Sequence, residues 1–325
     1  MRSLHTLPKA HLHLHLEGTA RPATIAEFAA EQGKSFSLPE RWDSFAQFND
    51  AYAAAVACIT RPDQLARICR EIVEDDAASG VQYIEPIFLP HAYADRFGMS
   101  VDEVFALVRN AFAAAGAELG VELGYQIAGI WHFDLDFSES TAEFAANHTD
   151  QGVVAYNFCG IEPADCAPWQ RAADIAREAG LGIIPHAGEF GPAGNVQRAI
   201  EVMAPDRICH GVRAIEDERV LDLLADRQMT CDIAATSNHA LNVFTAFELV
   251  PVRTFLDHQI PFTLGTDDAL FFGSTVQEEY EKVRTTFCLA DSEVAEIART
   301  SVNASFATAA TKARLNSAID QWLAS

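Results

Sequence analysis

Two patterns of apolar residues alternate along the chain. Short apolar runs of the kind that form buried strands occur eight times, at residues 7–18, 81–88, 121–131, 153–160, 181–189, 207–211, 229–236 and 261–268. Apolar residues at helical spacing lie between them and predict helices over residues 21–32, 62–78, 100–119, 140–148, 169–179, 195–203, 217–227, 252–258, 275–286, 291–303 and 312–323. An aromatic-rich stretch over residues 34–60 is expected to fold as short helices.

Strands that alternate with helices in this way form parallel βαβ units. Eight such units predict an α/β fold, a closed (β/α)8 barrel of the TIM type, for which about 250 residues are typical. The chain has 325 residues, and we assign the excess to extra helices after the first strand and at the C-terminus. The whole chain, residues 1–325, is then expected to be a single barrel domain. A doubly wound open sheet is the alternative, but no Gly-x-Gly-x-x-Gly turn follows an early strand.

The first predicted strand alternates histidine with leucine. Successive side chains of a strand point to opposite faces, so His11, His13 and His15 are expected to share one face and three leucines the other. A solvated edge strand is the alternative, but buried histidines need partners, and two imidazoles at i and i+2 can hold one metal ion. His11 lies about 7 Å further into the strand than His13. We therefore expect it to be a polar group of the barrel interior and not a ligand.

Polar residues also end several other predicted strands. In a (β/α)8 barrel, functional groups gather at the C-terminal ends of the strands. Any one such residue taken alone is better explained as a satisfied polar group of the core, but their common position favours one shared site. The residues of metal-binding or proton-transfer type at these ends are His13 and His15, His186 and Glu189, His210, and Asp267 and Asp268.

Charge and cysteine content narrow the choice of partners and compartment. The formal net charge of 23 − 46 = −23 argues against nucleic acid and anionic membranes as partners. The first residues lack the apolar region of a signal peptide, and no segment reaches the roughly 20 apolar residues of a membrane helix. Seven scattered cysteines without a Cys-x-x-Cys pair predict reduced core thiols and a cytoplasmic location.

Six motifs, in this order along nearly the whole chain, resemble those of the adenosine deaminase family. They are Leu7-Pro-Lys-Ala-His-Leu-His-Leu-His-Leu-Glu-Gly18, Phe158-Cys-Gly-Ile-Glu162, His186-Ala-Gly-Glu189, His210-Gly211, Thr236-Ser-Asn238 and Thr266-Asp-Asp268. The resemblance implies a barrel with one zinc ion, bound by His13, His15, His186 and Asp267. It also implies hydrolysis of an exocyclic amine on a purine-like small molecule, with release of ammonia.

The resemblance further assigns roles around the metal. It implies Glu189 as general acid, His210 as the group that orients or deprotonates the attacking water, and Asp268 as the residue that positions water and purine. Gly160 would offer backbone contacts to the base. Glu17 stands where typical adenosine deaminases have an aspartate that contacts the sugar hydroxyl, so this departure concerns the substrate and not the metal.

The predicted chemistry also follows from the residue types. Zinc with three or four N/O ligands lowers the pKa of a bound water to roughly 7 and so supplies a nucleophile at neutral pH. Protonation of a ring nitrogen by a carboxylic acid such as Glu189 makes the neighbouring amine-bearing carbon a better electrophile. Related barrels with two metals commonly use a modified lysine on the fourth strand, but residues 153–160 contain none. A single metal is therefore expected, with iron or another divalent ion as the alternative to zinc.

The substrate and the reaction class leave alternatives. Adenosine, free adenine and a 5′-modified adenosine such as aminodeoxyfutalosine all fit a 6-aminopurine deaminase of purine metabolism. A barrel that hydrolyses an amide or a phosphoester would use the same metal, and a binding protein that has lost activity would usually lack a ligand or the acid. Aromatic residues between Phe36 and Tyr52 are candidates for a lid over the pocket or for ordinary packing.

Overall fold

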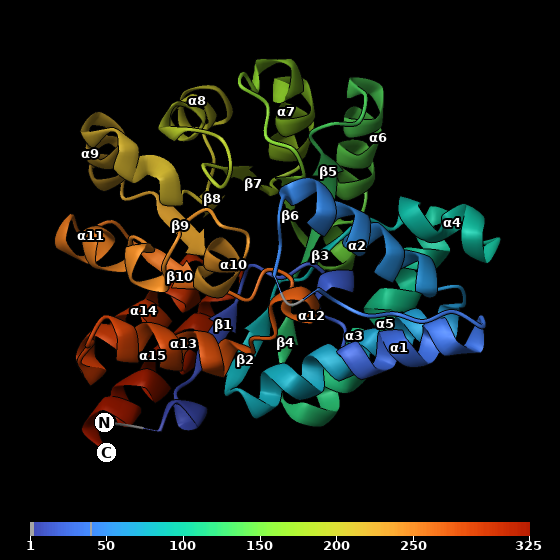
Figure 1. Cartoon of the computed structure of the whole chain (residues 1–325), viewed down its shortest axis with the longest axis horizontal. Coiled ribbons are helices and arrows are strands. Elements are labelled where there is room, and N and C mark those ends of the chain that lie inside the picture. The colour runs from blue at the N-terminus through green and yellow to red at the C-terminus, as the bar shows by residue number, and fades with distance from the viewer. Residues whose placement is uncertain (1–2, 40) are drawn as a thin grey trace.

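The computed structural model describes residues 3–39 and 41–325, and its parallel strands form a ring with helices outside it (Figure 1). Seven strands pair in the order β10-β9-β8-β7-β6-β5-β3, and three pair in the order β1-β2-β4. The strands are β1 (Lys9–His11), β2 (Val81–Ile84), β3 (Ile87–Phe88), β4 (Glu122–Leu123), β5 (Tyr125–Ile130), β6 (Val153–Cys159), β7 (Gly182–Ala187), β8 (Arg207–His210), β9 (Thr230–Ile233) and β10 (Phe262–Leu264).

These segments make up the eight strands of a closed barrel. The second barrel strand is divided into β2 and β3 around Pro86, which has no backbone N–H to donate. The third is divided into β4 and β5 at Gly124. Two isolated parallel bridges, Leu14 to Asp267 and His15 to Ile87, join the end of the first strand to its neighbours on both sides. The predicted (β/α)8 barrel and its eight strands are confirmed.

The helices follow the predicted order. Ser100 and Glu103 form the reciprocal capping box that opens one of them. The α-helices are α1 (Pro22–Glu31), α2 (Phe45–Cys58), α3 (Pro62–Ala78), α4 (His91–Phe97), α5 (Val101–Leu119), α6 (Leu135–Ala146), α7 (Gln170–Glu178), α8 (Ala193–Met203), α9 (Glu218–Arg227), α10 (Ala235–Ala240), α11 (Val252–Asp257), α12 (Ala269–Phe272), α13 (Val276–Thr286), α14 (Asp291–Ala304) and α15 (Ala309–Ala324).

Three local predictions differ from the structure. Within the aromatic-rich stretch, residues 45–58 form one continuous helix, α2, and the described residues before it are not helical. Helix α6 begins five residues before the predicted start at 140, because Asp134 caps it by accepting a hydrogen bond from the backbone N–H of Phe137. The seventh strand ends at Ile233 and not at Thr236, since Ala235 already opens α10. Short helices such as α4, α10 and α12 give too few turns for a periodic pattern to show.

The regular geometry of the first strand stops earlier than predicted. Strand β1 shifts register after Lys9 and ends at His11. His11 is buried, but its Nδ1 lies 2.9 Å from a carboxylate oxygen of Asp76 on α3, and its Nε2 accepts a hydrogen bond from the backbone N–H of Thr266. The partner on α3 belongs to the outer helical layer. His11 therefore joins strand to helix, and the prediction that it is a polar group of the barrel interior is wrong.

Buried ion pairs hold the barrel strands together beneath the site. The side chain of Arg207 is almost fully buried and donates to Glu85 at 2.7 Å and to Asp232 at 2.9 Å. Thr263 donates a further hydrogen bond to Asp232 at 2.8 Å. Because a buried charge is tolerated only when it is paired, this network fixes the register of the second, sixth, seventh and eighth strands. The backbone carbonyl of Asp232 is then available to hold a site histidine.

Two further structural facts concern the helices and the cysteines. None of the helices within residues 3–39 and 41–325 is long and apolar enough to cross a lipid bilayer. All seven cysteines are free thiols, and Cys288 is exposed whereas the other six are buried.

Candidate active site

Closure of the barrel places the first candidate ligands. The backbone N–H of Asp267 donates to the carbonyl of His13, and the N–H of His15 donates to the carbonyl of Asp267, both at 3.0 Å. Asp267 and His210 adopt left-handed backbone conformations with φ of 58° and 66°. Such conformations are costly for residues other than glycine and cluster at functional sites. The backbone hydrogen bonds between the eighth strand and the first thus bring Asp267 next to His13 and His15.

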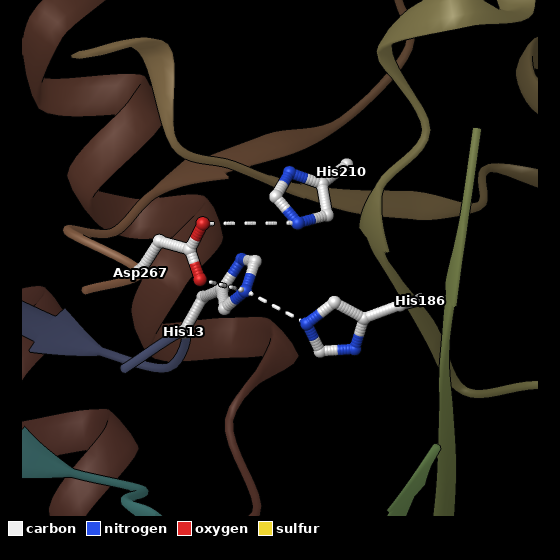
Figure 2. A group of neighbouring side chains, drawn as sticks. All are labelled: His13, His186, His210 and Asp267. Atoms are coloured by element: carbon white, nitrogen blue, oxygen red, sulfur yellow. Dashed lines mark hydrogen bonds and ion pairs between the residues drawn. The ribbon is translucent and has the colours of Figure 1, made fainter. Parts of the chain in front are cut away.

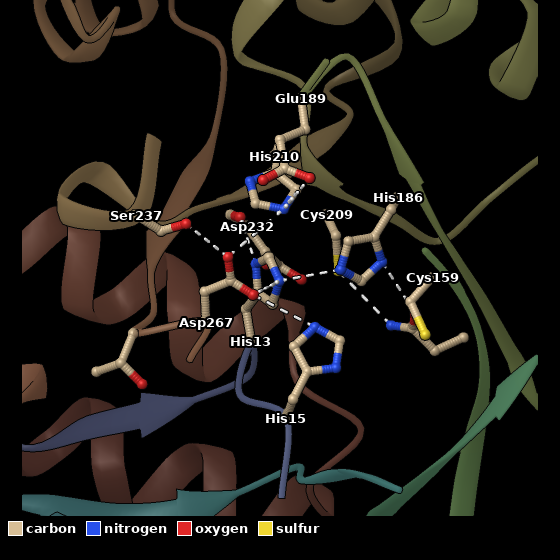
Figure 3. Close-up of polar contacts among 12 residues, drawn as sticks. His13, His15, Cys159, His186, Glu189, Cys209, His210, Asp232, Ser237 and Asp267 are labelled. Atoms are coloured by element: carbon tan, nitrogen blue, oxygen red, sulfur yellow. Dashed lines mark hydrogen bonds and ion pairs between the residues drawn. The ribbon is translucent and has the colours of Figure 1, made fainter. Parts of the chain in front are cut away.

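Five side chains bring nitrogen and oxygen donors together at this end of the barrel (Figures 2 and 3). His13 Nε2 lies 3.2 Å from His186 Nε2 and 3.4 Å from Asp267 Oδ1. Asp267 Oδ1 is 3.3 Å from His15 Nε2, and Asp267 Oδ2 is 4.0 Å from His210 Nε2. Among the described residues, His13, His186, His210 and Asp267 have donor atoms that all lie within 4.8 Å of one another. The predicted ligand His15 falls in a second group, with Asp267 and Asp268, and shares Asp267 with the first.

Hydrogen bonds at the far side of two imidazoles aim their Nε2 atoms into the cluster. His13 Nδ1 lies 2.9 Å from the carbonyl oxygen of Asp232. His186 Nδ1 lies 3.0 Å from the carbonyl oxygen of Phe158 and 3.1 Å from Asn157 Oδ1. In metal sites, a ligating histidine almost always donates its other ring N–H to such an oxygen. Both imidazoles are therefore held as metal ligands are.

The donor set fits a divalent metal. Ser237 Oγ donates to Asp267 Oδ2 at 2.7 Å and so orients the carboxylate. Within the described ranges, His210 Nε2 and Asp268 Oδ1 are buried without a hydrogen-bond partner, although buried polar atoms normally have one. Imidazole nitrogens with one carboxylate oxygen are ligands that zinc prefers. An ion with its bound water would satisfy the buried atoms that the protein leaves unpaired.

Burial and the neighbouring charges shift the pKa values of the site in opposite directions. Burial raises the pKa of Glu189 well above its ordinary value, and the negative charges of Asp267 and Glu162 add to the shift. Burial and the charge of Asp267 likewise raise the pKa of Asp268. Burial would also raise the pKa of Asp267, but the charge of His13 outweighs it and holds this pKa well below its usual range. The site thus contains one carboxylate suited to bind a cation and two carboxyl groups suited to carry a proton.

His210 is the group suited to accept a proton. Burial, followed by the positive charge of His13, lowers the pKa of His210 to about 3, so the imidazole is neutral at neutral pH. Its Nε2 lies 3.6 Å from a carboxylate oxygen of Glu189, and its Nδ1 lies 3.1 Å from the amide nitrogen of Asn238. In Figure 3, Glu189 and His210 lie together on one side of the cluster. A proton donor and a proton acceptor therefore flank the same donor atoms.

A pocket opens directly above the cluster. Its cavity has a volume of about 140 Å³, and the predicted acid Glu189 and both Asp267 and Asp268 line it. A concave site with a few convergent polar groups is typical of small-molecule binding. Helix α2 supplies one wall, and its pocket-lining side chains are Phe45, Phe48, Asn49 and Tyr52. The aromatic residues after the first strand therefore line the pocket as well as pack around it.

The two predicted substrate-binding residues outside the metal cluster lie in different positions. Gly160 lines the pocket with a φ of +93°, a conformation in which glycine is favoured. Glu17 is buried and is absent from the described residues that line the pocket. Its carboxylate instead accepts hydrogen bonds from Tyr52 at 3.1 Å and from Tyr93 at 2.8 Å. Neither carboxylate oxygen of Glu17 is thus left without a protein partner.

The sequence reasoning gave no role to two pocket residues that lie at or just after strand ends. His132 lines the pocket two residues after β5, and Cys159 is the last residue of β6. Both satisfy the same criterion that identified the metal-ligand candidates, a polar or reactive residue at the end of a predicted strand. A Cβ at Gly160 would lie 2.8 Å from His132 Nδ1. His132 and Gly160 therefore pack closely at one side of the pocket.

Comparison with known proteins gives one consistent result. A family model described as adenosine deaminase matches residues 8–322. A putative adenosine/adenine deaminase from Streptomyces virginiae is 37% identical over 99% of this chain and 98% of its own length. An adenine deaminase from Rhizobium rhizogenes is 35% identical over 95% of this chain and 98% of its own length. The crystal structure of an adenine deaminase from Arthrobacter aurescens superimposes with a TM-score of 0.88 at 27% identity, covering 98% of this chain and 99% of that one.

Proposed function

The chain belongs to the adenosine deaminase family and is a purine deaminase, and from that premise we propose that it hydrolyses the free base adenine with the help of one zinc ion. His13, His15, His186 and Asp267 would hold the ion. When bound, zinc supplies Lewis-acid chemistry that lowers the pKa of an adjacent water molecule to about 7. The absence of lysine from β6 favours one metal over a bridged pair.

The protein groups around the pocket supply the proton transfers. The raised pKa of Glu189 keeps its carboxyl group protonated at neutral pH, so that it can donate to the ring nitrogen beside the amine-bearing carbon. The neutral imidazole of His210 takes a proton from the attacking water. Asp268, whose Oδ1 has no partner among the described residues, orients that water. His210 gives the proton that it took to the departing amine, which leaves as ammonia. The hydroxyl on the ring carbon returns a proton to Glu189 and remains as the carbonyl oxygen.

The observation that carries the choice of free adenine is the position of Glu17. In the family pattern, the acid at this position contacts a sugar hydroxyl. Here both of its oxygens already accept hydrogen bonds from Tyr52 and Tyr93, and Tyr52 stands between it and the pocket as part of the α2 wall. A buried acid that is satisfied by two phenols has little to gain from a ribose hydroxyl. Two of the related proteins are also described as adenine deaminases.

A substrate panel tests this proposal. Metal-replete protein is incubated with adenine, adenosine and a 5′-modified adenosine, and ammonia release gives kcat/KM for each. We expect kcat/KM for adenine to exceed that for either nucleoside by about 10²-fold or more, because the ribose hydroxyls would lose water in a pocket where the Glu17 carboxylate is already paired and offers them no hydrogen bond. Equal or faster deamination of a nucleoside would overturn the choice of adenine and leave the deaminase chemistry intact.

A further inference from the structure

One carboxylate, that of Glu162, holds the loop that carries the predicted general acid. Glu162 lies two residues after Gly160 in the segment that follows β6. Its two oxygens accept hydrogen bonds from four successive backbone N–H groups and one side-chain amide: Gly188 at 2.7 Å, Glu189 at 2.8 Å, Phe190 at 3.0 Å, Gly191 at 3.3 Å and Asn195 Nδ2 at 3.3 Å. Such a concave run of N–H groups is an anion-binding arrangement of the backbone.

The loop is shaped around this carboxylate. Gly188 has a φ of +69°, which glycine adopts at little cost. A Cβ at Gly191 would lie 2.6 Å from Glu162 Oε2, so the backbone approaches the acid as closely as a glycine permits. The N–H groups of residues 188–191 precede α8 and have no strand partner. Without Glu162 this part of the loop would therefore lose the acceptor that satisfies and orders it.

The same contacts connect two parts of the pocket. Glu162 belongs to the segment that supplies Gly160, and the loop it holds supplies Glu189. The side chain of Glu189 lies 3.6 Å from His210 Nε2, a placement that depends on where the backbone of residue 189 is fixed. The Glu162 carboxylate thus fixes the backbone that contacts the base and the backbone that carries the proton donor relative to each other. A shift of about 1 Å in such a placement can lower the rate about 10²-fold.

We propose that Glu162 is a positioning residue for the general acid Glu189, acting through the backbone N–H groups of residues 188–191. The inference rests on the proposed role of Glu189. The charge of Glu162 acts in the same direction, because it opposes ionisation of Glu189 and helps to keep the acid protonated. Sequence reasoning singled out the Phe158-Cys-Gly-Ile-Glu162 segment, and this clamp gives its last residue a role.

The test is a double-mutant cycle with adenine as substrate. Glu162→Gln keeps the shape of the side chain but turns an amide NH₂ toward backbone donors. We expect kcat to fall about 10²-fold while KM stays within about threefold, because ground-state binding is preserved. In a Glu189→Gln background, the same change should lower the residual kcat by less than about threefold. Asp165→Asn is the matched control, because Asp165 is exposed, lies on the same segment and, among the described residues, forms hydrogen bonds with Ala167 and Arg198. This variant should keep wild-type kcat.

The outcomes separate the positioning role of Glu162 from the general-acid role of Glu189. A Glu162→Gln enzyme with wild-type kcat, or one that loses as much in the Glu189→Gln background as in the wild type, overturns the positioning role. Should Glu162→Gln fail to fold, Glu162→Asp replaces it, because the charge stays and the carboxylate is withdrawn by one methylene. Its kcat should then fall at least about tenfold, and a wild-type value overturns the inference. Wild-type kcat in Glu189→Gln itself would instead remove the proposed acid, and the inference with it.

Discussion

Glu189→Gln is expected to lower kcat for adenine about 10³-fold while the protein keeps its fold and its metal. General acid catalysis is worth roughly 10²–10⁴-fold, and glutamine is close in shape to glutamate but has no acidic proton to give. His210 is a poor substitute for Glu189 as a proton donor. Burial and the charge of His13 lower its pKa to about 3, so the imidazole is neutral at the pH of the assay. Steady-state ammonia release and metal analysis of the same sample measure both parts of this prediction.

The pH profile adds a second readout for Glu189. Because burial raises the pKa of its carboxyl group, the acid is protonated below that raised value and loses its proton above it. The kcat of the wild-type enzyme should therefore fall as the pH rises through the pKa of Glu189, and the Gln variant should lack this basic limb. Glu201→Gln, an exposed change on α8, is the matched control and should leave the profile unchanged. A Gln variant that retains both the rate and the basic limb would show that another group is the acid.

Asp267→Asn is expected to cost more, at least about 10⁴-fold in kcat, together with loss of bound metal. The carboxylate lies within 3.4 Å of His13 and His15 Nε2 atoms, and an amide is a far weaker ligand for zinc than a carboxylate. Without the ion, the pKa of water in the pocket returns toward its far higher ordinary value, and the nucleophile is lost at neutral pH. Asparagine tolerates the left-handed backbone that residue 267 adopts, so barrel closure is preserved.

Metal content and folding distinguish the causes of such a loss. Elemental analysis should find about one zinc per wild-type chain and much less in the Asn variant, while circular dichroism of the two proteins should agree. Asp257→Asn, at the exposed end of α11, controls for the loss of a negative charge and should keep both metal and rate. An Asn variant that binds zinc as tightly as the wild type, or that deaminates adenine at the wild-type rate, would remove Asp267 from the ligand set.

The position of the candidate metal site could be predicted because it follows a rule of the fold. Parallel strands of a barrel bring their C-terminal ends to one face, so His13, His15, His186, His210 and Asp267 were expected together once their strands were recognised. The ligand set itself, with His15 and without His210, came from the resemblance to the adenosine deaminase family. The structure groups the other four side chains most tightly and places His15 beside Asp267.

Side-chain contacts between segments that are far apart in the sequence could not be predicted from the apolar pattern. The carboxylate of Glu162 is oriented by backbone N–H groups some 26–29 positions further along the chain, and backbone donors leave no trace in residue type. Glu17 was expected to contact the substrate, but its partners Tyr52 and Tyr93 come from α2 and α4, and neither pairing follows from periodicity. His11 failed for a related reason, because strand alternation applies only while the backbone stays regular, and β1 ends at that residue.

Zinc titration of metal-stripped protein, followed by ammonia release from adenine, tests the central claim most directly. With one ion held by three imidazoles and one carboxylate, activity should rise linearly with added zinc, reach its plateau at one equivalent per chain and gain nothing from a second. Full activity without metal, or a plateau only at two equivalents, would contradict the mononuclear site on which this account of the deamination depends.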